Sequence, residues 1–237
     1  MNFRRHLNGP NIALVTVFAG FIAASTLWGG VELAAGVPIT LQTFAVMLAG
    51  AVLGPWRGAA AVILYLVLGT AGVPIFAGHT TGAIAWPSPT AGFLIGFIPA
   101  AFVTGWIVRG LRRRNMLTYS GAFGAAVMGG IVVLYPIGWG YLSWKLGLDF
   151  QSTVLAAVPF VIGDIIKCVF VALVATAVHR AYPGLLPAKP KAMADAVVAT
   201  ASEVTTASEV TTASDATTAS GKGAAGEPEE SATLTTA

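Results

Sequence analysis

The sequence predicts an all-α, polytopic membrane protein with six transmembrane helices, and two observations lead to this fold class. Hydrophobic residues make up 56% of the 237 residues and charged residues only 10%, and the mean hydropathy is +0.78. A water-soluble domain of this length needs far more charge on its surface. The apolar residues also fall in long blocks, which short breaks with Gly, Pro or Arg separate. This distribution is typical of helices embedded in lipid.

The hydrophobic blocks place the helices at about residues 11–28, 39–54, 57–70, 90–109, 118–140 and 152–181. A basic flank precedes the first block, as in a secretory signal, but five further apolar blocks follow, so we expect this helix to be retained. The second and third are shorter than the roughly 20 residues of a straight crossing, so we expect them to be tilted or partly enclosed.

Residues 70–90 contain too many Gly and Pro for a continuous helix and too many apolar residues for an ordinary solvated loop. Non-helical backbone at membrane depth is tolerated only against protein or beside a cavity. We therefore expect this segment to fold over one end of the bundle.

The arginines orient the predicted bundle. They fall at one side of the membrane, at Arg4, Arg5, Arg57, Arg109, Arg112, Arg113, Arg114 and Arg180. The loops of the opposite side contain Lys145 as their one basic residue. The positive-inside rule therefore predicts that both termini are cytoplasmic. It also accounts for the net charge of +3 without a nucleic-acid partner.

The composition changes at about residue 187 and divides the chain into two parts. Residues 1–187 form the predicted transmembrane domain, and residues 188–237 are rich in Ala, Thr, Ser and Glu. The second part repeats EVTTAS at 203–208 and 209–214, followed by DATTAS at 215–220. Such a segment has too few large apolar residues to offset the loss of chain entropy, so we expect a disordered cytoplasmic tail.

Two ionisable residues, Asp164 and Lys167, interrupt the sixth predicted helix. Their spacing places them on one helix face, and a start near residue 152 puts Asp164 roughly 18 Å along the axis at about 1.5 Å per residue. Charges at this depth are costly and usually functional, so we expect the pair to bind a ligand. The alternative is a mutually neutralising ion pair that locks the bundle.

Other polar candidates lie in GVPITLQTF at 36–44, where we expect Pro38 to open a helix with Thr40, Gln42 and Thr43 in its first turns. Each of these side chains could simply cap backbone groups of the helix. The irregular 70–90 segment, which includes Trp86, is expected to fold over the same end. Together these elements would form a pocket with apolar walls and few polar anchors.

Four longer stretches resemble one known family, the BioY family. They are VPITLQTFAVMLAGAVLGPWRGA at 37–59, YLVLGTAGVPIFAG at 65–78, PTAGFLIGF at 89–97 and GDIIK at 163–167. This family contains the biotin-binding substrate-capture (S) components of energy-coupling-factor (ECF) transporters. The resemblance covers about residues 10–182 and implies a six-helix S-component-like bundle in a bacterial or archaeal cytoplasmic membrane.

The resemblance also implies roles for particular residues. It assigns biotin binding to Asp164 and Lys167, and to Gln42 and Thr40 through the shared ITLQ motif. The middle loop departs from the usual glycine-rich form and reads GHTTGAIAWPSPTAG, in which we expect Trp86 to contribute an aromatic wall. Biotin is then the transported substrate, and we expect no cofactor and no metal site.

The resemblance further implies a transmembrane coupling subunit (EcfT-like) and two cytoplasmic ATPases as partners. The chain has no P-loop of its own, since its one Gly-Lys pair lies in the tail without the preceding glycine. Ala19 and Ala23, alongside Gly20 and Ala24, form small-residue faces that could dock the coupling subunit or pack within the bundle. Whether the chain also forms a homo-oligomer is left open.

The sequence leaves three alternative functions open. The chain could capture another small vitamin, or it could be an intramembrane enzyme that uses Asp164 and Lys167 as an acid and base pair. An enzyme of this kind would need a second cluster of His, Ser or carboxylate residues to position the reacting bond, and the predicted spans contain none. A structural assembly subunit would leave the two buried charges unexplained.

Overall fold

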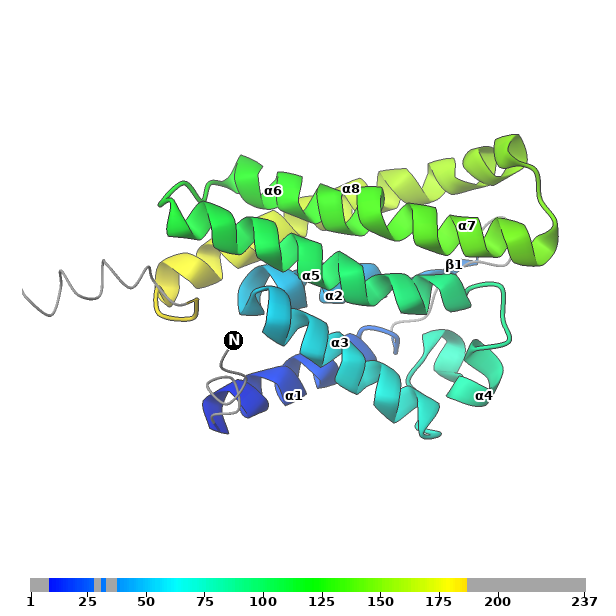
Figure 1. The fold of residues 1–237 in the computed structure, drawn as a ribbon, viewed down its shortest axis with the longest axis horizontal. Coiled ribbons are helices and arrows are strands. Elements are labelled where there is room, and N and C mark those ends of the chain that lie inside the picture. Colours follow the sequence, from blue (N-terminus) through cyan, green and yellow to red (C-terminus); the bar gives the residue numbers. More distant parts are fainter. Residues whose placement is uncertain (1–8, 28–30, 33–37, 187–237) are drawn as a thin grey trace, which may run out of the picture. The chain divides into compact units, whose positions relative to one another are not determined.

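The structure is a computed structural model, and it describes residues 9–27, 31–32 and 38–186. Helices make up most of these residues, and they pack side by side as Figure 1 shows. The predicted tail at 188–237 lies outside the described residues. It therefore stays a prediction.

All six predicted segments are helical. The six helical stretches are α1 (Gly9–Ala24), α2 (Gln42–Leu53), α3 (Pro55–Thr70), α5 (Ala91–Arg113), the run α6 (Tyr119–Val127), η4 (Met128–Val133) and α7 (Leu134–Leu146), and α8 (Phe150–Ala181). Of the helices in the described residues, α5, the α6–α7 run and α8 are long and apolar enough to cross a membrane. The other three are shorter apolar helices, as predicted for the second and third.

A single glycine separates α2 from α3. Gly54 has φ 82° and ψ 177°, a backbone conformation that favours glycine because it has no Cβ. Pro55 then occupies the first turn of α3, where its missing N–H costs no hydrogen bond. The chain can therefore turn sharply between two buried helices without a loop.

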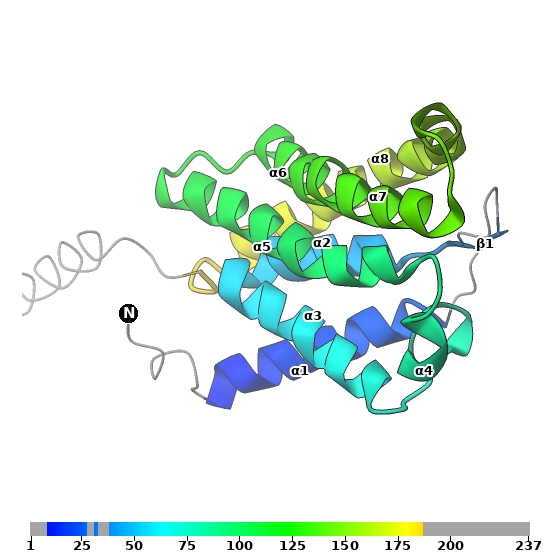
Figure 2. The same cartoon turned by 45° about the vertical axis from the view of Figure 1, so that its right-hand side comes forward.

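Helix α5 lies at the centre of the bundle and packs against α2, α3 and α7, whereas α1 covers α3 and α8 packs on α2 and α6 (Figures 1 and 2). The α2–α5 contact is very close. A Cβ at Gly50 would lie 2.2 Å from the carbonyl oxygen of Ala101, and one at Gly105 would lie 2.6 Å from the carbonyl oxygen of Gly50. Such small residues let helix backbones approach each other within a membrane.

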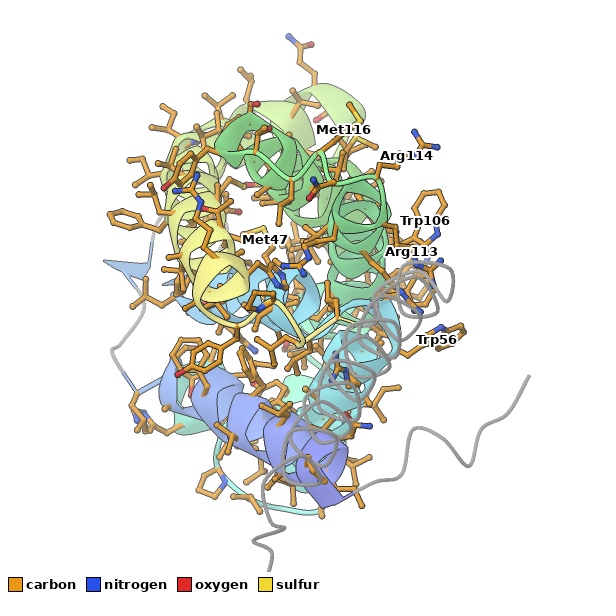
Figure 3. The ribbon with its side chains drawn as sticks, turned by 90° about the vertical axis from the view of Figure 1, so that its left-hand side faces the viewer. Met47, Trp56, Trp106, Arg113, Arg114 and Met116 are labelled. Carbon is orange, nitrogen blue, oxygen red and sulfur yellow. The ribbon has the colours of Figure 1, made fainter. Side chains whose placement is uncertain are left out.

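The π-helical turn η4 lies between α6 and α7 in the fifth predicted span and packs closely against α5 and α2. A Cβ at Gly129 would lie 1.9 Å from Oγ1 of Thr104, and one at Gly130 would lie 2.1 Å from Sδ of Met47. Figure 3 shows Met47 inside the bundle, between the helices. A π-turn takes up one residue more than an α-turn, so it changes the side that the following residues face. The π-turn therefore sets which residues of α7 face the interior of the bundle.

The predicted irregular segment between α3 and α5 is confirmed as largely non-helical. Phe76 and Thr80 pair in an isolated β-bridge around the short turn η3 (Ala77–His79), and the four-residue helix α4 (Gly82–Ala85) follows. Phe76 is buried in the apolar core between this segment and α3. The segment is therefore folded against protein.

One expectation about the second helix was wrong. Pro38 does not open it, because Pro38 and Ile39 form the strand β2 (Pro38–Ile39), which pairs antiparallel with β1 (Val31–Glu32). Proline has no N–H to donate to the ladder and is therefore found at the first residue of a strand, as Pro38 is here. Helix α2 begins at Gln42 instead.

Helix α8 begins with a capped first turn. The carboxylate of Asp149 accepts hydrogen bonds from the backbone N–H groups of Gln151 and Ser152, at 3.1 and 3.2 Å. Hydrogen bonding by Ser152, first through its side chain and then through its backbone, lowers the pKa of Asp149 below its usual value. The cap is therefore complete at neutral pH and weakens only when the pH falls through this lowered pKa.

The close approach of α2 and α5 can be tested with two glycine substitutions. We expect Gly50→Ala to destabilise the protein by about 1–3 kcal/mol, because the added methyl group overlaps the α5 backbone. Gly124 has no neighbouring atom within 4 Å of an added Cβ, so Gly124→Ala is the matched control. The measurement is thermal unfolding in detergent, followed by tryptophan fluorescence. Equal melting temperatures for the two variants would contradict the packing described here.

Candidate functional site

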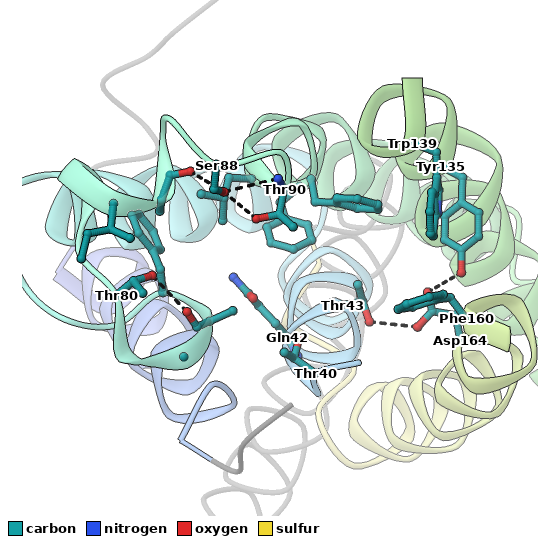
Figure 4. Close-up of a pocket in the computed structure, with 18 of the residues that line it drawn as sticks. Thr40, Gln42, Thr43, Thr80, Ser88, Thr90, Tyr135, Trp139, Phe160 and Asp164 are labelled. Atoms are coloured by element: carbon teal, nitrogen blue, oxygen red, sulfur yellow. Dashed lines mark hydrogen bonds between the residues drawn. The ribbon is translucent and has the colours of Figure 1, made fainter. Parts of the chain in front are cut away.

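A cavity of about 440 Å³ opens among the start of α2, the segment between α3 and α5, the start of α5, and the facing sides of α7 and α8 (Figure 4). This volume lies within the range of small-molecule sites. The side chains that carry polar or aromatic groups into it are Thr40, Gln42, Thr43, Phe76, Thr80, Ser88, Thr90, Phe93, Phe97, Tyr135, Trp139, Phe160, Asp164 and Lys167. Ten of these fourteen side chains carry a polar group, so the cavity combines aromatic and apolar surface with many polar atoms.

One end of the cavity holds the ion pair. Lys167 Nζ lies 2.7 Å from Asp164 Oδ1, and the two side chains are only 12% and 7% exposed. Thr43 from α2 joins them, because its hydroxyl accepts from Lys167 at 3.0 Å and donates to Asp164 at 3.1 Å. Tyr135 from α7 donates to the second carboxylate oxygen at 2.9 Å. Three helices therefore meet at one carboxylate.

These contacts determine what the ion pair can offer a ligand. Asp164 accepts three hydrogen bonds from protein groups, so most of its accepting capacity is used. Lys167 has three N–H donors and uses two, on Asp164 and Thr43. The free group at this end is therefore an ammonium N–H, which binds a carboxylate or a carbonyl oxygen.

Trp139 is the centre of an aromatic wall next to the ion pair. Its ring meets those of Phe160, Phe93 and Tyr135 edge-on, with centroids 5.2, 5.8 and 6.3 Å away. Trp139 is 5% exposed, and its indole N–H has no hydrogen-bond partner among the described residues. A buried donor without a partner is costly, and a ligand acceptor in the cavity would remove that cost.

Gln42 and Thr40 line another part of the cavity, at the start of α2. Gln42 is 3% exposed and its amide nitrogen donates to the hydroxyl of Tyr65 at 2.7 Å. Thr40 Oγ1 accepts from the backbone N–H of Gln42 at 3.3 Å and also lines the cavity. The capping role considered for Thr40 and its position at the cavity are thus compatible.

The segment between α3 and α5 adds three hydroxyl groups to the rim. Ser88 and Thr90 lie 2.7 Å apart, and Thr80 donates to the carbonyl oxygen of Ala77 at 3.0 Å. Figure 4 shows Ser88 and Thr90 together, with Thr80 apart from them and Gln42 in between. Their hydroxyl groups can bind polar atoms of a ligand near the opening.

The structure corrects the position expected for Trp86. Its indole N–H donates to Oγ1 of Thr70 at 2.9 Å, and its ring packs against the far side of Phe76, 6.4 Å between centroids. Trp86 follows α4 and faces the end of α3, so it does not line the cavity. Phe76 supplies the aromatic surface that we expected from Trp86.

The small-residue faces of α1 also need a correction. Ala19 is 2% exposed and belongs to the apolar core that α1 shares with α3, and Ala23 packs against the same core. Gly20 and Ala24 are the exposed small residues of this helix. Ala19 therefore packs within the bundle and Ala23 does so in part, whereas Gly20 and Ala24 are exposed.

Sequence reasoning missed two of the residues at the ion pair. Tyr135 and Trp139 are four residues apart, which places them on one face of α7, but aromatic residues at this spacing are common in membrane helices. No feature of the sequence indicated the π-turn that directs them inward. The structure brings Asp164, Lys167, Gln42 and Thr40 to one cavity, and their role in binding stays a prediction.

By fold and site, the chain is a multi-pass membrane protein with a small-molecule cavity at one end of its helices. It resembles a solved structure described as the S-component for biotin from an ECF-type ABC transporter. The TM-score is 0.69 at 22% sequence identity, and the match covers 76% of this chain and 95% of the other. The predicted S-component-like fold is confirmed.

The family follows from the sequence comparisons. The family model described as the BioY family matches residues 3–184, so the chain belongs to the BioY family. It is 41% identical over 188 residues to the biotin transporter BioY of Rhodobacter capsulatus, covering 76% of this chain and 98% of that protein. It is 42% identical over 183 residues to the biotin transporter BioY of Rhizobium etli, covering 76% and 97%. The resemblance noted in the sequence is confirmed.

The buried ion pair predicts a pattern of stabilities. We expect Asp164→Asn to destabilise the protein by about 3–5 kcal/mol, because it leaves the Lys167 charge buried without its counter-charge. The double variant Asp164→Asn with Lys167→Met should recover most of this loss. Thermal unfolding of the three proteins in detergent measures the effect.

The control for this series is Lys145→Met, which removes an exposed lysine at the end of α7. It should leave the melting temperature nearly unchanged, since exposed charges contribute little to stability. A double variant that is less stable than Asp164→Asn alone would contradict a simple neutralising pair.

Proposed function

We propose that this chain captures biotin at the outer face of a cytoplasmic membrane, as the substrate-binding subunit of an ECF-type transporter. One observation carries the proposal: in a BioY-family chain, a cavity of about 440 Å³ combines an aromatic wall with a buried ion pair that has an unused donor. Two relatives that match over three quarters of this chain are named biotin transporters.

The chemistry of the cavity suits biotin. Biotin has a ureido ring with two N–H donors and a carbonyl acceptor, an apolar bicycle with a thioether, and a chain that ends in a carboxylate. The free N–H groups of Lys167 and Trp139 can bind the oxygens of the ligand, while Phe93 and Phe160 cover apolar surface. Asp164 contributes indirectly, because its contact with Lys167 holds the ammonium group in place.

The orientation in the membrane is also part of the proposal, with both termini cytoplasmic. The structure supports it by gathering basic residues at the end of the bundle away from the cavity. Arg57 donates to Asn11 at the start of α1 and to the carbonyl oxygen of Leu185 after α8, and Arg112 donates to those of His179 and Pro183.

Two exposed tryptophans, Trp56 and Trp106, lie at the same end, while a third, Trp144, lies at the other end in the last turn of α7. Figure 3 shows Trp56 and Trp106 along one edge of the bundle together with Arg113. Tryptophan and arginine are enriched at membrane interfaces, arginine mainly on the cytoplasmic side. The cavity would then open on the outer side, where a nutrient is captured.

Partner subunits complete the proposed transporter. A transmembrane coupling subunit and two cytoplasmic ATPases would supply the energy, as the ECF-type description of the structural neighbour suggests. The exposed face of α1 that carries Gly20 and Ala24 would allow close approach of a partner helix.

The central test is biotin binding by the purified chain without ATP. We expect a stoichiometric complex by titration calorimetry in detergent, since the cavity is already formed. Asp164→Asn and Lys167→Ala should each weaken binding by at least 10- to 100-fold, because charge-assisted hydrogen bonds are worth roughly 1.5–3 kcal/mol.

The double variant Asp164→Asn with Lys167→Met separates binding from stability. It should fold but still bind biotin poorly, because the donor from Lys167 is gone. A double variant with wild-type affinity would refute the site. Heat of binding with another vitamin, and none with biotin, would refute the substrate while leaving the transporter class.

Removal of residues 188–237 tests the proposed two-part organisation. We expect the truncated chain to insert in the membrane and bind biotin with an affinity within about 2-fold of the full chain, since the repeats offer no apolar face to the bundle. The measurement is the same titration on both proteins. A truncated chain that does not insert or bind would show that the tail is required.

A further inference from the structure

Tyr65 has no place in the cavity, yet it contacts a residue that does. It lies on α3, is fully buried, and its hydroxyl is 2.7 Å from the amide nitrogen of Gln42 and 3.1 Å from the carbonyl oxygen of Ile75. Its ring packs edge-on against Phe76, with centroids 5.4 Å apart. The side chain is therefore held on all sides.

The direction of these hydrogen bonds follows from counting hydrogens. A tyrosine hydroxyl has one hydrogen, and the carbonyl oxygen of Ile75 can only accept. If that hydrogen is used on Ile75, the hydroxyl oxygen must accept from Gln42. Gln42 therefore turns its NH₂ group toward Tyr65, and the opposite rotation of the amide would set two oxygens against each other.

The hydroxyl of Thr26, just after α1, also lies near the carbonyl oxygen of Ile75, at 3.0 Å. A threonine hydroxyl has one hydrogen as well, and its shorter contact is to the carbonyl oxygen of Ala23, at 2.7 Å. With the Thr26 hydrogen on Ala23, the Tyr65 hydroxyl is the donor to Ile75. The direction of the Tyr65 hydrogen is thereby fixed.

The orientation of Gln42 decides what it offers to a ligand. One N–H of the Gln42 amide is used on Tyr65, and the amide oxygen has no hydrogen-bond partner among the described residues. Because Gln42 lines the cavity (Figure 4), this oxygen is an acceptor for a ligand donor. The unused groups of Lys167 and Trp139, by contrast, are donors.

We infer that Tyr65 is a positioning residue for specificity: it locks the rotation of the Gln42 amide so that the amide oxygen is held as an acceptor for a ligand N–H. Applied to biotin, the inference rests on the proposed function and assigns a ureido N–H to Gln42. The lock itself is a property of the chain alone, so it can be measured without any ligand.

The ligand-free test uses the two glutamines of the chain, Gln42 and Gln151. Gln151 is exposed and provides an internal control. In protein labelled with ¹⁵N at glutamine side chains, we expect slow hydrogen exchange at the Gln42 NH₂ group and fast exchange at Gln151. Tyr65→Phe should remove the protection of Gln42. Equal exchange at both glutamines in the wild-type chain would overturn the inference whatever the ligand.

The ligand test compares biotin with its two N-methyl derivatives, a pair of isomers in which one or the other ureido nitrogen is methylated. Tyr65→Phe should weaken biotin binding about 3- to 10-fold, the effect of one neutral hydrogen bond. It should change binding of the isomer that lacks the critical N–H by less than about 2-fold. Equal losses for biotin and both isomers would show that Tyr65 only supports packing, and would overturn the positioning role.

Two further variants complete the experiment. Gln42→Leu removes the acceptor itself and should abolish the preference for biotin over the same isomer, which decides the point if Tyr65→Phe does not fold. Tyr182→Phe removes a hydroxyl from an exposed tyrosine after α8 and should change nothing. Failure of the wild-type chain to bind biotin would count against the proposed function only, because the exchange measurement still tests the lock.

Discussion

The structure depends on the contacts that surround one carboxyl group buried among the membrane helices. An isolated charge in this environment costs several kcal/mol, and the cost falls only when a counter-charge and hydrogen bonds surround it. Asp164 receives these from Lys167, Thr43 and Tyr135, which come from its own helix α8, from α2 and from α7. The packing of three helices is thus tied to one side chain.

The cost of burying an unpaired polar group also determines how the other polar atoms of the cavity are arranged. Most donors and acceptors near the cavity bind each other or the backbone, and only a few are left for a ligand. Lys167 and Trp139 each keep a donor, and Gln42 keeps an acceptor. A site of this kind selects ligands through a small number of fixed directions, while the aromatic wall contributes area without direction. The groups that fix those directions, such as Tyr65, need not touch the ligand.

The sequence predicted the helices well, because lipid requires long apolar runs that composition alone reveals. It also identified Asp164 and Lys167, since charges in such runs are rare. It failed where contacts between distant segments decide the outcome. Trp86 donates a hydrogen bond to Thr70 and lies outside the cavity, and Ala19 packs in the core that α1 shares with α3. Neither contact has a signature in local spacing. The roles of the site residues in binding still rest on the family resemblance and the cavity chemistry.

The π-turn η4 has a consequence for how such a cavity can change during evolution. A turn with one additional residue becomes an ordinary α-helical turn when that residue is deleted, and all later residues of the helix then rotate by about 100°. Such a deletion between 128 and 133 would swing Tyr135 and Trp139 out of the cavity in one step, while the two ends of the span would keep nearly the same positions. A single lost codon could therefore replace half of the aromatic wall, which point mutations could achieve only one side chain at a time.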